Sequence, residues 1–494
     1  MIYVFLISGL FIGWSMGAND TGNIFGAAVS TRMIRFRQAA LIAAVFYFLG
    51  AVLEGSGPSG TLGRLGSVDA LGGAFTVALA AALAILVIVR LGIPVSISQT
   101  IVGALIGWNY FSGRLTNFSS LLTIASSWVT AFVAAAGIAA LLFYLVRGWI
   151  NNSKRHLLEQ DMIIRSALIL FGAVGAYFLG ANTIANAVGV FVPVTPFRDL
   201  ALGPFLFITG VQQLYIIGSL AVVLGIYTYS HRVMGTVGKD IFQLSPATAL
   251  VALLTETIVL FLFSSRALHD LLVAVGLPPI PLVPISSTQV IVGAVIGIGL
   301  AKGGKNIRYN VLGKVTLAWI AAPAMAFLFS FVALFITQNV FELEAYHPLT
   351  YSVDKSAVQE IARRGIDTNK LSFVNLRTFK TELELYRELT FEETYPPEAA
   401  KEIISISENH PLLVKLELLQ KRGLDKRLNQ EQLAALSQLE DKSFKRRWNL
   451  AQTLAKDPSW QLVEAPQTQA DESYNADLQA DLDLLYKVFY HPKD

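Results

Sequence analysis

Two near-identical polar segments lie inside stretches that are otherwise apolar. GANDTGN occupies residues 17–23 and GANTIAN occupies residues 180–186; we call them the GAN motifs. Amide and carboxylate groups are expensive at membrane depth, so they either bond to a neighbouring helix or line a binding site, and two matching copies favour the site. Their oxygens suit a hard cation, and the glycines would let each helix unwind around an ion. The residues of the two motifs that could hold a cation are Asn19, Asp20, Asn23, Asn182, Thr183 and Asn186.

A second pair of motifs carries hydroxyl groups. PVSISQTIVGALIG at residues 94–107 matches PISSTQVIVGAVIG at residues 284–297, and we call their first six residues the Pro-x-Ser motifs. Proline suits the first turn of a helix, and a helix N-terminus offers free N–H groups and a positive dipole end to an anion. The alternative is that the hydroxyls bond only to their own helix. The residues expected to contact an anion are Asp20, Ser96, Ser98, Gln99, Ser286, Thr288 and Gln289.

Both motifs occur in the same order in each half of the chain, which indicates an internal duplication. Apolar stretches of membrane-spanning length follow the same plan, with five in each half. Because five is an odd number, the halves must face opposite ways, as in an inverted repeat. We expect the GAN motif to break the long first span of each half. The predicted spans are residues 2–30, 38–56, 71–91, 94–112, 119–146, 163–190, 203–229, 246–265, 284–301 and 310–337.

Charge is distributed unevenly along the chain. Of its 494 residues 54% are apolar and only 15% are charged, and the mean hydropathy is +0.54. Residues 1–337 hold 18 Lys and Arg against 9 Asp and Glu, whereas residues 338–494 hold 20 against 26. In the predicted topology fourteen basic residues of the apolar part fall on one side and four on the other. The positive-inside rule makes the first side cytoplasmic, which places both termini outside the cytoplasm.

These patterns predict an all-α integral membrane protein. It would have two inverted-topology repeats with broken helices, about ten to twelve membrane helices, and a soluble helical domain at its C-terminus. The expected boundaries are residues 1–146 and 163–337 for the two transmembrane repeats, 147–162 for a cytoplasmic linker, and 338–494 for an extracytoplasmic, mostly helical domain. That last domain could regulate the protein, dock a partner or stabilise a homodimer.

At these motifs the sequence resembles the PiT family of inorganic phosphate transporters, the cation-coupled phosphate symporters. The resemblance covers roughly residues 1–337 and rests on the duplicated GAN and Pro-x-Ser segments. It implies an inverted-repeat fold, usually counted at twelve helices, in which the motif residues surround phosphate and its coupling cations. Ten long spans fit that count if each broken first span counts twice.

The sequence departs from the family pattern in two ways. The family usually has an acid in both GAN motifs, but Thr183 stands in the second. A common family histidine is Gln99 in the first repeat and Gln289 in the second, which argues against a histidine-based proton relay. Glu54 and Glu256 are further acids in or near the spans, and each could be a buried hydrogen-bonding group or a coupling carboxylate.

The function that follows is secondary active import of inorganic phosphate across the inner (cytoplasmic) membrane, coupled to Na⁺ or alternatively to H⁺. Sulfate or another oxyanion is the alternative substrate, because some members of the family are sulfate permeases. An anion channel or a membrane sensor is a more remote reading. Since no acid–base or nucleophile constellation is visible in the sequence, we expect neither an enzyme nor a cofactor. The expected partners are the anion and the lipid bilayer, with no nucleic acid.

Overall fold

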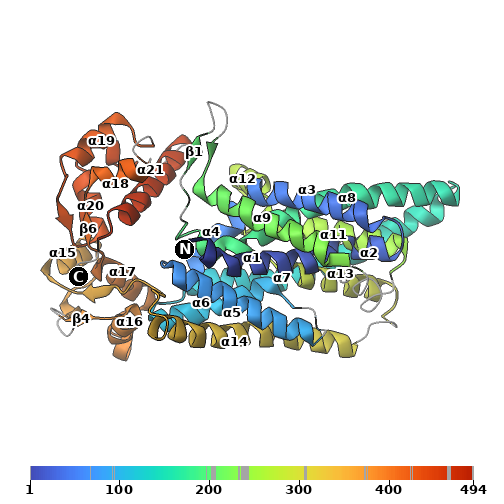
Figure 1. The fold of residues 1–494 in the computed structure, drawn as a ribbon, viewed down its shortest axis with the longest axis horizontal. Helices are drawn as coiled ribbons and strands as arrows, with labels where there is room; N and C mark the ends of the chain where they lie inside the picture. Colours follow the sequence, from blue (N-terminus) through green and yellow to red (C-terminus); the bar gives the residue numbers. More distant parts are fainter. Residues whose placement is uncertain are drawn as a thin grey trace. The chain divides into compact units, whose positions relative to one another are not determined.

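The computed structural model describes residues 2–491, apart from residues 67, 92, 94, 196, 198, 202–206, 232–233, 235–243, 305–308, 372–373, 375–376, 423, 425–426 and 464–468. Two compact units are present (Figure 1). The membrane unit comprises Met1–Phe111 and Thr116–His347, and the C-terminal unit comprises Ser112–Leu115 and Pro348–Asp494. Pro94, the first residue of one Pro-x-Ser motif, lies outside the described residues.

The membrane unit is helical apart from one short ribbon. Its first repeat contains α1 (Ile2–Asn19), α2 (Thr21–Ser30), α3 (Phe36–Glu54), α4 (Ser56–Leu65), α5 (Leu71–Arg90), α6 (Ile97–Ser112) and α7 (Phe118–Asn152). Its second repeat contains α8 (Leu157–Val188), η1 (Gly189–Phe191), the antiparallel pair β1 (Leu200–Ala201) and β2 (Phe207–Ile208), α9 (Gly210–Thr228), α11 (Pro246–Ser264), α12 (Arg266–Ala274), α13 (Ser287–Ala301) and α14 (Tyr309–Asn339).

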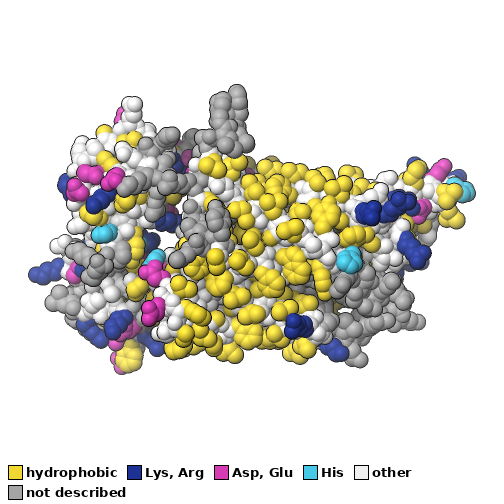
Figure 2. All heavy atoms as spheres, viewed as in Figure 1, with side chains coloured by type: hydrophobic (Ala, Val, Ile, Leu, Met, Phe, Trp, Pro, Cys, Tyr) yellow, Lys and Arg dark blue, Asp and Glu magenta, His cyan; other side chains and the backbone are white. Residues whose placement is uncertain are grey.

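Seven helices in the described part of the chain are long and apolar enough to cross a bilayer. They are α3, α5, α7, α8 with its η1 extension, α9, α11 and α14. Hydrophobic side chains cover much of the face of this unit seen in Figure 2, as expected where lipid takes the place of water. The Pro-x-Ser helices α6 and α13 have only 16 and 15 residues. At 1.5 Å per residue they are shorter than a hydrocarbon core of about 30 Å.

The GAN motif interrupts the helix in the first repeat but not in the second. α1 ends at Asn19 and α2 begins at Thr21, whereas α8 continues through the second motif to Val188. The expectation of a broken span in both halves is therefore wrong for the second. The local sequence differs in the same region, because Thr183 replaces Asp20 at the interruption itself and Ala185 replaces Gly22 two residues later. Alanine favours a helix by about 1 kcal/mol over glycine.

The helix bounds also bear on the linker and on the helix count. The predicted linker, residues 147–162, is mostly helical, because α7 extends to Asn152 and α8 begins at Leu157. Because α8 is one continuous helix, the first span of the second repeat counts once, and the ten predicted spans no longer add up to twelve helices.

Glycines allow the repeats to pack with backbones in direct contact. A Cβ at Gly17 of α1 would lie 1.9 Å from the Val222 carbonyl oxygen of α9, and a Cβ at Gly180 of α8 would lie 2.1 Å from that of Tyr47 in α3. Gly17 and Gly180 are matching residues of the two GAN motifs. The contacts α1–α9 and α8–α3 are therefore equivalent, and each joins the two repeats.

The Pro-x-Ser helices also pack against helices of the opposite repeat. A Cβ at Gly103 of α6 would lie 2.2 Å from the Pro323 carbonyl oxygen of α14, and one at Gly293 of α13 would lie 2.6 Å from the Phe132 carbonyl oxygen of α7. Each repeat thus packs its Pro-x-Ser helix against the last helix of the other repeat. These reciprocal contacts show that matching residues of the two sequence repeats pack in equivalent ways.

The C-terminal unit is mostly helical, with small antiparallel sheets that the sequence did not predict. One sheet has the order β4-β3-β5 and the other pairs β6 with β7. The elements are β3 (Thr350–Ser352), α15 (Lys355–Arg363), η3 (Asn369–Leu371), β4 (Thr378–Phe379), α16 (Glu382–Thr390), η4 (Phe391–Glu393), α17 (Pro397–Ser407), β5 (Glu408–Asn409), β6 (Leu412–Leu413), α18 (Leu416–Arg422), α19 (Gln430–Ser437), β7 (Ser443–Phe444), α20 (Arg447–Leu454), η5 (Pro458–Trp460) and α21 (Gln469–Val488).

A buried arginine pairs with an acid in this unit. Arg446 is fully buried, and its guanidinium donates to the Asp354 carboxylate at 2.9 Å and to the Ser352 carbonyl oxygen at 2.8 Å. Burial alone would raise the pKa of Asp354, but hydrogen bonds from Arg446 and from Lys445 hold that pKa well below its usual range. The carboxylate is therefore ionised at neutral pH and pairs with the arginine.

Gly225 tests whether close backbone packing holds the membrane unit together. A Cβ there would lie 2.0 Å from the Trp14 carbonyl oxygen of α1, whereas nothing lies within 4 Å of a Cβ at Gly137 of α7. We expect Gly225→Ala to cost about 1–3 kcal/mol by overpacking. The measurement is the thermal unfolding midpoint in detergent. Gly137→Ala is the matched control and should keep the wild-type midpoint; equal midpoints for both variants would contradict the packing argument.

Candidate functional site

The first GAN motif places an acid at a one-residue interruption between α1 and α2. The Asp20 backbone N–H donates to the Met16 carbonyl oxygen at 2.7 Å, and the Asn23 N–H donates to the Asp20 carbonyl oxygen at 3.0 Å. The chain is tightened at Asp20 rather than opened out. Asp20 is buried, and its carboxylate accepts from the Asn19 amide at 3.3 Å.

The second GAN motif presents its side chains from an unbroken helix. Asn182, Thr183 and Asn186 are all buried in α8. The Asn182 amide donates to the Ser264 hydroxyl at 3.0 Å and to the Val283 carbonyl oxygen at 3.1 Å. Thr183 donates to the carbonyl oxygen of Leu179 one turn earlier, at 2.7 Å, which is compatible with a continuous helix.

In each Pro-x-Ser motif the first serine caps a helix. The Ser96 hydroxyl accepts from the Gln99 N–H at 3.3 Å, and the Ser286 hydroxyl accepts from the Gln289 N–H at 3.2 Å. The helices begin at Ile97 and Ser287, so Pro284 lies before the first turn and not within it, contrary to the sequence expectation. Ser98 and Thr288 are in the first turns, as expected.

The two Pro-x-Ser motifs cross and bond to each other. The Ser98 hydroxyl donates to the Ile285 carbonyl oxygen at 3.1 Å, and the Thr288 hydroxyl donates to the Val95 carbonyl oxygen at 3.3 Å. Ser98 and Thr288 are matching residues, as are Val95 and Ile285, so the two bonds are related by the internal symmetry. The expected meeting of two helix N-termini is therefore seen.

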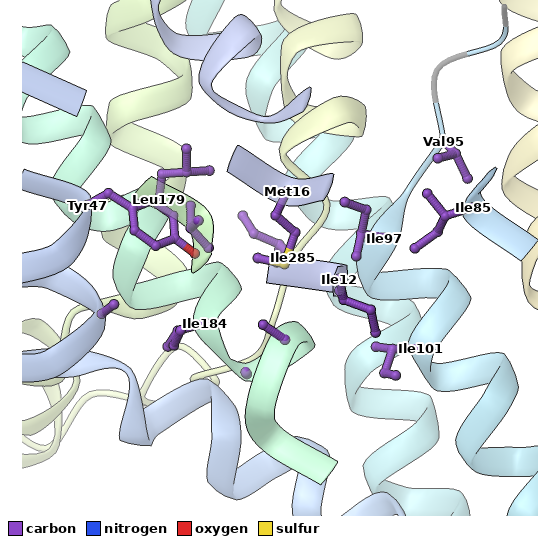
Figure 3. Close-up of a cluster of buried hydrophobic side chains, with 14 of the residues drawn as sticks. Ile12, Met16, Tyr47, Ile85, Val95, Ile97, Ile101, Leu179, Ile184 and Ile285 are labelled. Atoms are coloured by element: carbon purple, nitrogen blue, oxygen red, sulfur yellow. The ribbon is translucent and has the colours of Figure 1, made fainter. Parts of the chain in front are cut away.

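Each GAN motif bonds to the Pro-x-Ser motif of the opposite repeat. The Asn23 amide donates to the Ser287 hydroxyl, and the Asn186 amide donates to the Ser98 hydroxyl, both at 2.9 Å. All four motifs thus come together at one place. Figure 3 shows a buried apolar cluster to which the motifs contribute Ile97, Ile184 and Ile285, together with Met16, which directly precedes the first GAN motif.

Glu256 and Ser287 also belong to this site. Ser287 was not predicted, and Glu256 was considered either a buried hydrogen-bonding group or a coupling carboxylate, without a link to the motifs. Glu256 of α11 is fully buried and accepts a hydrogen bond from the Ser287 hydroxyl, which in turn accepts from Asn23. An acid within a membrane span was a usable signal for Glu256, but spacing along the chain did not connect it to the motifs. Glu54 lies elsewhere, where its carboxylate accepts from the Tyr177 hydroxyl and the Arg266 N–H, both at 3.2 Å.

Several oxygens at the crossing are buried without a hydrogen-bond partner among the described residues. They are Gln99 Oε1, Asn182 Oδ1, Asn186 Oδ1, Glu256 Oε2 and Gln289 Oε1. Leaving such acceptors unpaired is costly unless a ligand satisfies them. Uncharged and carboxylate oxygens are the ligands that hard cations prefer, so these atoms fit Na⁺.

Known proteins share this architecture. The profile of the phosphate transporter family matches residues 16–330 and 280–381. A Methanocaldococcus jannaschii protein named "Putative phosphate permease" is 28% identical over 327 residues, covering 66% of this chain and 95% of the relative. A Pyrococcus horikoshii protein of the same description is 25% identical, with the same coverage of each chain.

A solved structure described as "The sodium-dependent phosphate transporter" has the same fold. It superimposes with a TM-score of 0.53 at 23% identity and covers 68% of this chain and 98% of its own. The repeated motifs, their reciprocal contacts and these similarities agree: this chain belongs to the phosphate transporter family.

Proposed function

We propose that the protein imports inorganic phosphate together with Na⁺ by alternating access of its two repeats. The observation that carries this proposal is the exchange of hydrogen bonds, in which Asn23 and Asn186 each bond to the opposite repeat. Movement of one repeat against the other must change these contacts, and therefore changes the site. Na⁺ is favoured over H⁺ because the solved relative is described as sodium-dependent and because most oxygens at the site cannot be titrated.

Phosphate would bind between the two helix caps. Ser96 and Ser286 use their oxygens to accept from Gln99 and Gln289, and their hydroxyl hydrogens have no acceptor within the described part of the chain. These hydroxyls and the Gln99 and Gln289 amides form a symmetric set of donors for anion oxygens. In the arrangement seen here Ser98 and Thr288 donate to backbone carbonyls, so their role is to fix the crossing.

The coupling cations would bind at two positions with different chemistry. At the first, Asp20 with Asn19 and Asn23 lies beside the pair of Ser287 and Glu256. At the second, the free oxygens of Asn182 and Asn186 face the site without a carboxylate, with Thr183 between them in sequence.

The membrane potential sets the number of cations. Moving one negative charge into a cell against 100 mV costs roughly 2.3 kcal/mol, so dianionic phosphate costs about 4.6 kcal/mol before any concentration gradient. Two cations cancel this cost, and a third would make import electrically driven. We therefore propose at least two cations for each dianion.

The proposed location is the inner (cytoplasmic) membrane, with both termini outside the cytoplasm. The excess of basic residues on one side of the predicted topology supports this orientation. The C-terminal unit would then be extracytoplasmic, and a homodimer is one assembly it could stabilise.

The coupling ion can be tested in proteoliposomes at fixed pH. Phosphate uptake should saturate, and it should fall to background when choline replaces external Na⁺, because the unpaired oxygens then lack their cation. Excess sulfate should compete poorly. Uptake that is unchanged in choline would rule out Na⁺ coupling, uptake that does not saturate would indicate a channel, and full competition by sulfate would make it the better substrate.

Asp20→Asn tests whether this acid contacts both cation and anion. An ionised carboxylate is acceptor-only, so it favours a phosphate hydroxyl and repels a bare sulfate oxygen. We expect the variant to lose Na⁺ dependence and to discriminate between phosphate and sulfate at least about tenfold less well. The readout is phosphate uptake with and without Na⁺ and sulfate.

Asp270→Asn is the control, because Asp270 is an exposed acid of α12. It should behave as wild type in both assays. If Asp20→Asn loses Na⁺ dependence but keeps the wild-type preference for phosphate, Asp20 contacts only the cation.

A further inference from the structure

The two GAN motifs differ in charge at one of their matching positions, and this difference extends to a neighbouring helix. Asp20 of the first motif corresponds to Thr183 of the second. The Thr183 hydroxyl lies 2.9 Å from the Tyr47 hydroxyl of α3. In the other repeat the residue that packs in place of Tyr47 is Val222, since Gly17 contacts Val222 as Gly180 contacts Tyr47.

The direction of the Tyr47–Thr183 bond follows from counting hydrogens. The Thr183 hydroxyl has one hydrogen, and it is donated to the Leu179 carbonyl oxygen at 2.7 Å. Tyr47 must therefore donate to Thr183. The Thr183 oxygen is left with one lone pair, and it carries no charge. Asp20, with Val222 at the equivalent place, keeps a full carboxylate, and among the described residues its side-chain donor is the Asn19 amide.

Tyr47 is held firmly as that donor. Its side chain is 2% exposed and lies beside Leu179 in the apolar cluster drawn in Figure 3. Its backbone carbonyl is the group that Gly180 packs against. Because a phenol hydroxyl in apolar surroundings needs a partner, the bond to Thr183 is stable in this arrangement.

We propose that the Tyr47–Thr183 hydroxyl pair makes the two cation positions unequal. The position at the second repeat is neutral, binds Na⁺ more weakly than the position at Asp20, and sets the Na⁺ concentration that gives half-maximal uptake. This inference rests on the proposed function, because it assigns different properties to the two cations of the same transport cycle.

Electrostatics supports the inequality. An opposite charge within a few ångströms commonly favours the charged form of a neighbouring group by about one to three pKa units, which corresponds to roughly tenfold to a thousandfold in affinity for a proton. A metal cation responds to the same field. The neutral oxygens of Asn182, Asn186 and Thr183 bring no charge of their own, so Na⁺ there relies on their dipoles and on the more distant charge of Asp20, whose field reaches Tyr47.

The test compares Thr183→Asp with Thr183→Asn, two side chains of the same shape that differ in charge. Phosphate uptake by proteoliposomes is measured as a function of external Na⁺. We expect Thr183→Asp to lower the half-maximal Na⁺ concentration at least about tenfold relative to Thr183→Asn, since Tyr47 can donate to a carboxylate as it does to Thr183. Equal half-maximal concentrations in the two variants would overturn the proposal.

Tyr47→Phe provides an independent variant if the buried acid prevents insertion. Without the phenol hydroxyl, the Thr183 oxygen regains its second lone pair for a cation, and the half-maximal Na⁺ concentration should fall several-fold below wild type. An unchanged value would contradict the proposal. Failure of the proposed function looks different, because the wild-type protein itself would then show no Na⁺-dependent phosphate uptake.

Discussion

Polar groups at bilayer depth must find partners within the protein, and this constraint organises the membrane unit. The GAN and Pro-x-Ser motifs satisfy it by bonding across the two repeats, as Asn23 does with Ser287 and Asn186 with Ser98. Water cannot take over these bonds in a hydrocarbon environment. The site is therefore held together by contacts that neither repeat can make alone, and both repeats must be in place for it to form.

Close backbone packing makes these exchanged bonds geometrically possible. Gly17 and Gly180 bring α1 and α8 against helices of the other repeat, while Gly103 and Gly293 do the same for the two short Pro-x-Ser helices. The described residues directly before those helices are buried, namely Val95 and Ser96 in one repeat and Ile285 and Ser286 in the other. An irregular backbone is tolerated at this depth only where protein or a cavity surrounds it, and the crossing motifs provide that protection.

The sequence predicted the duplication, the approximate spans and the motif residues that meet, because these depend on local composition and on repetition. It did not predict that α8 stays unbroken, where the copy has Thr183 and Ala185 in place of Asp20 and Gly22. Nor did it reveal that Glu256 and Asn23 both bond to Ser287, or that Tyr47 donates to Thr183. The partners in these hydrogen bonds are 31 to 264 residues apart along the chain. The small sheets of the C-terminal unit were missed as well, because strands of two or three residues leave no periodic pattern.

The central claim is that the cross-repeat bonds assemble the binding site, and a double-mutant cycle tests it most directly. Na⁺-dependent binding of radiolabelled phosphate would be measured for purified wild type, Asn186→Ala, Ser98→Ala and the double variant. Because the two side chains share a buried hydrogen bond, the account predicts a coupling of about 0.5–3 kcal/mol in the free energy of binding, with the double variant little worse than either single one. Strictly additive losses would mean that Asn186 and Ser98 act independently and would contradict the account.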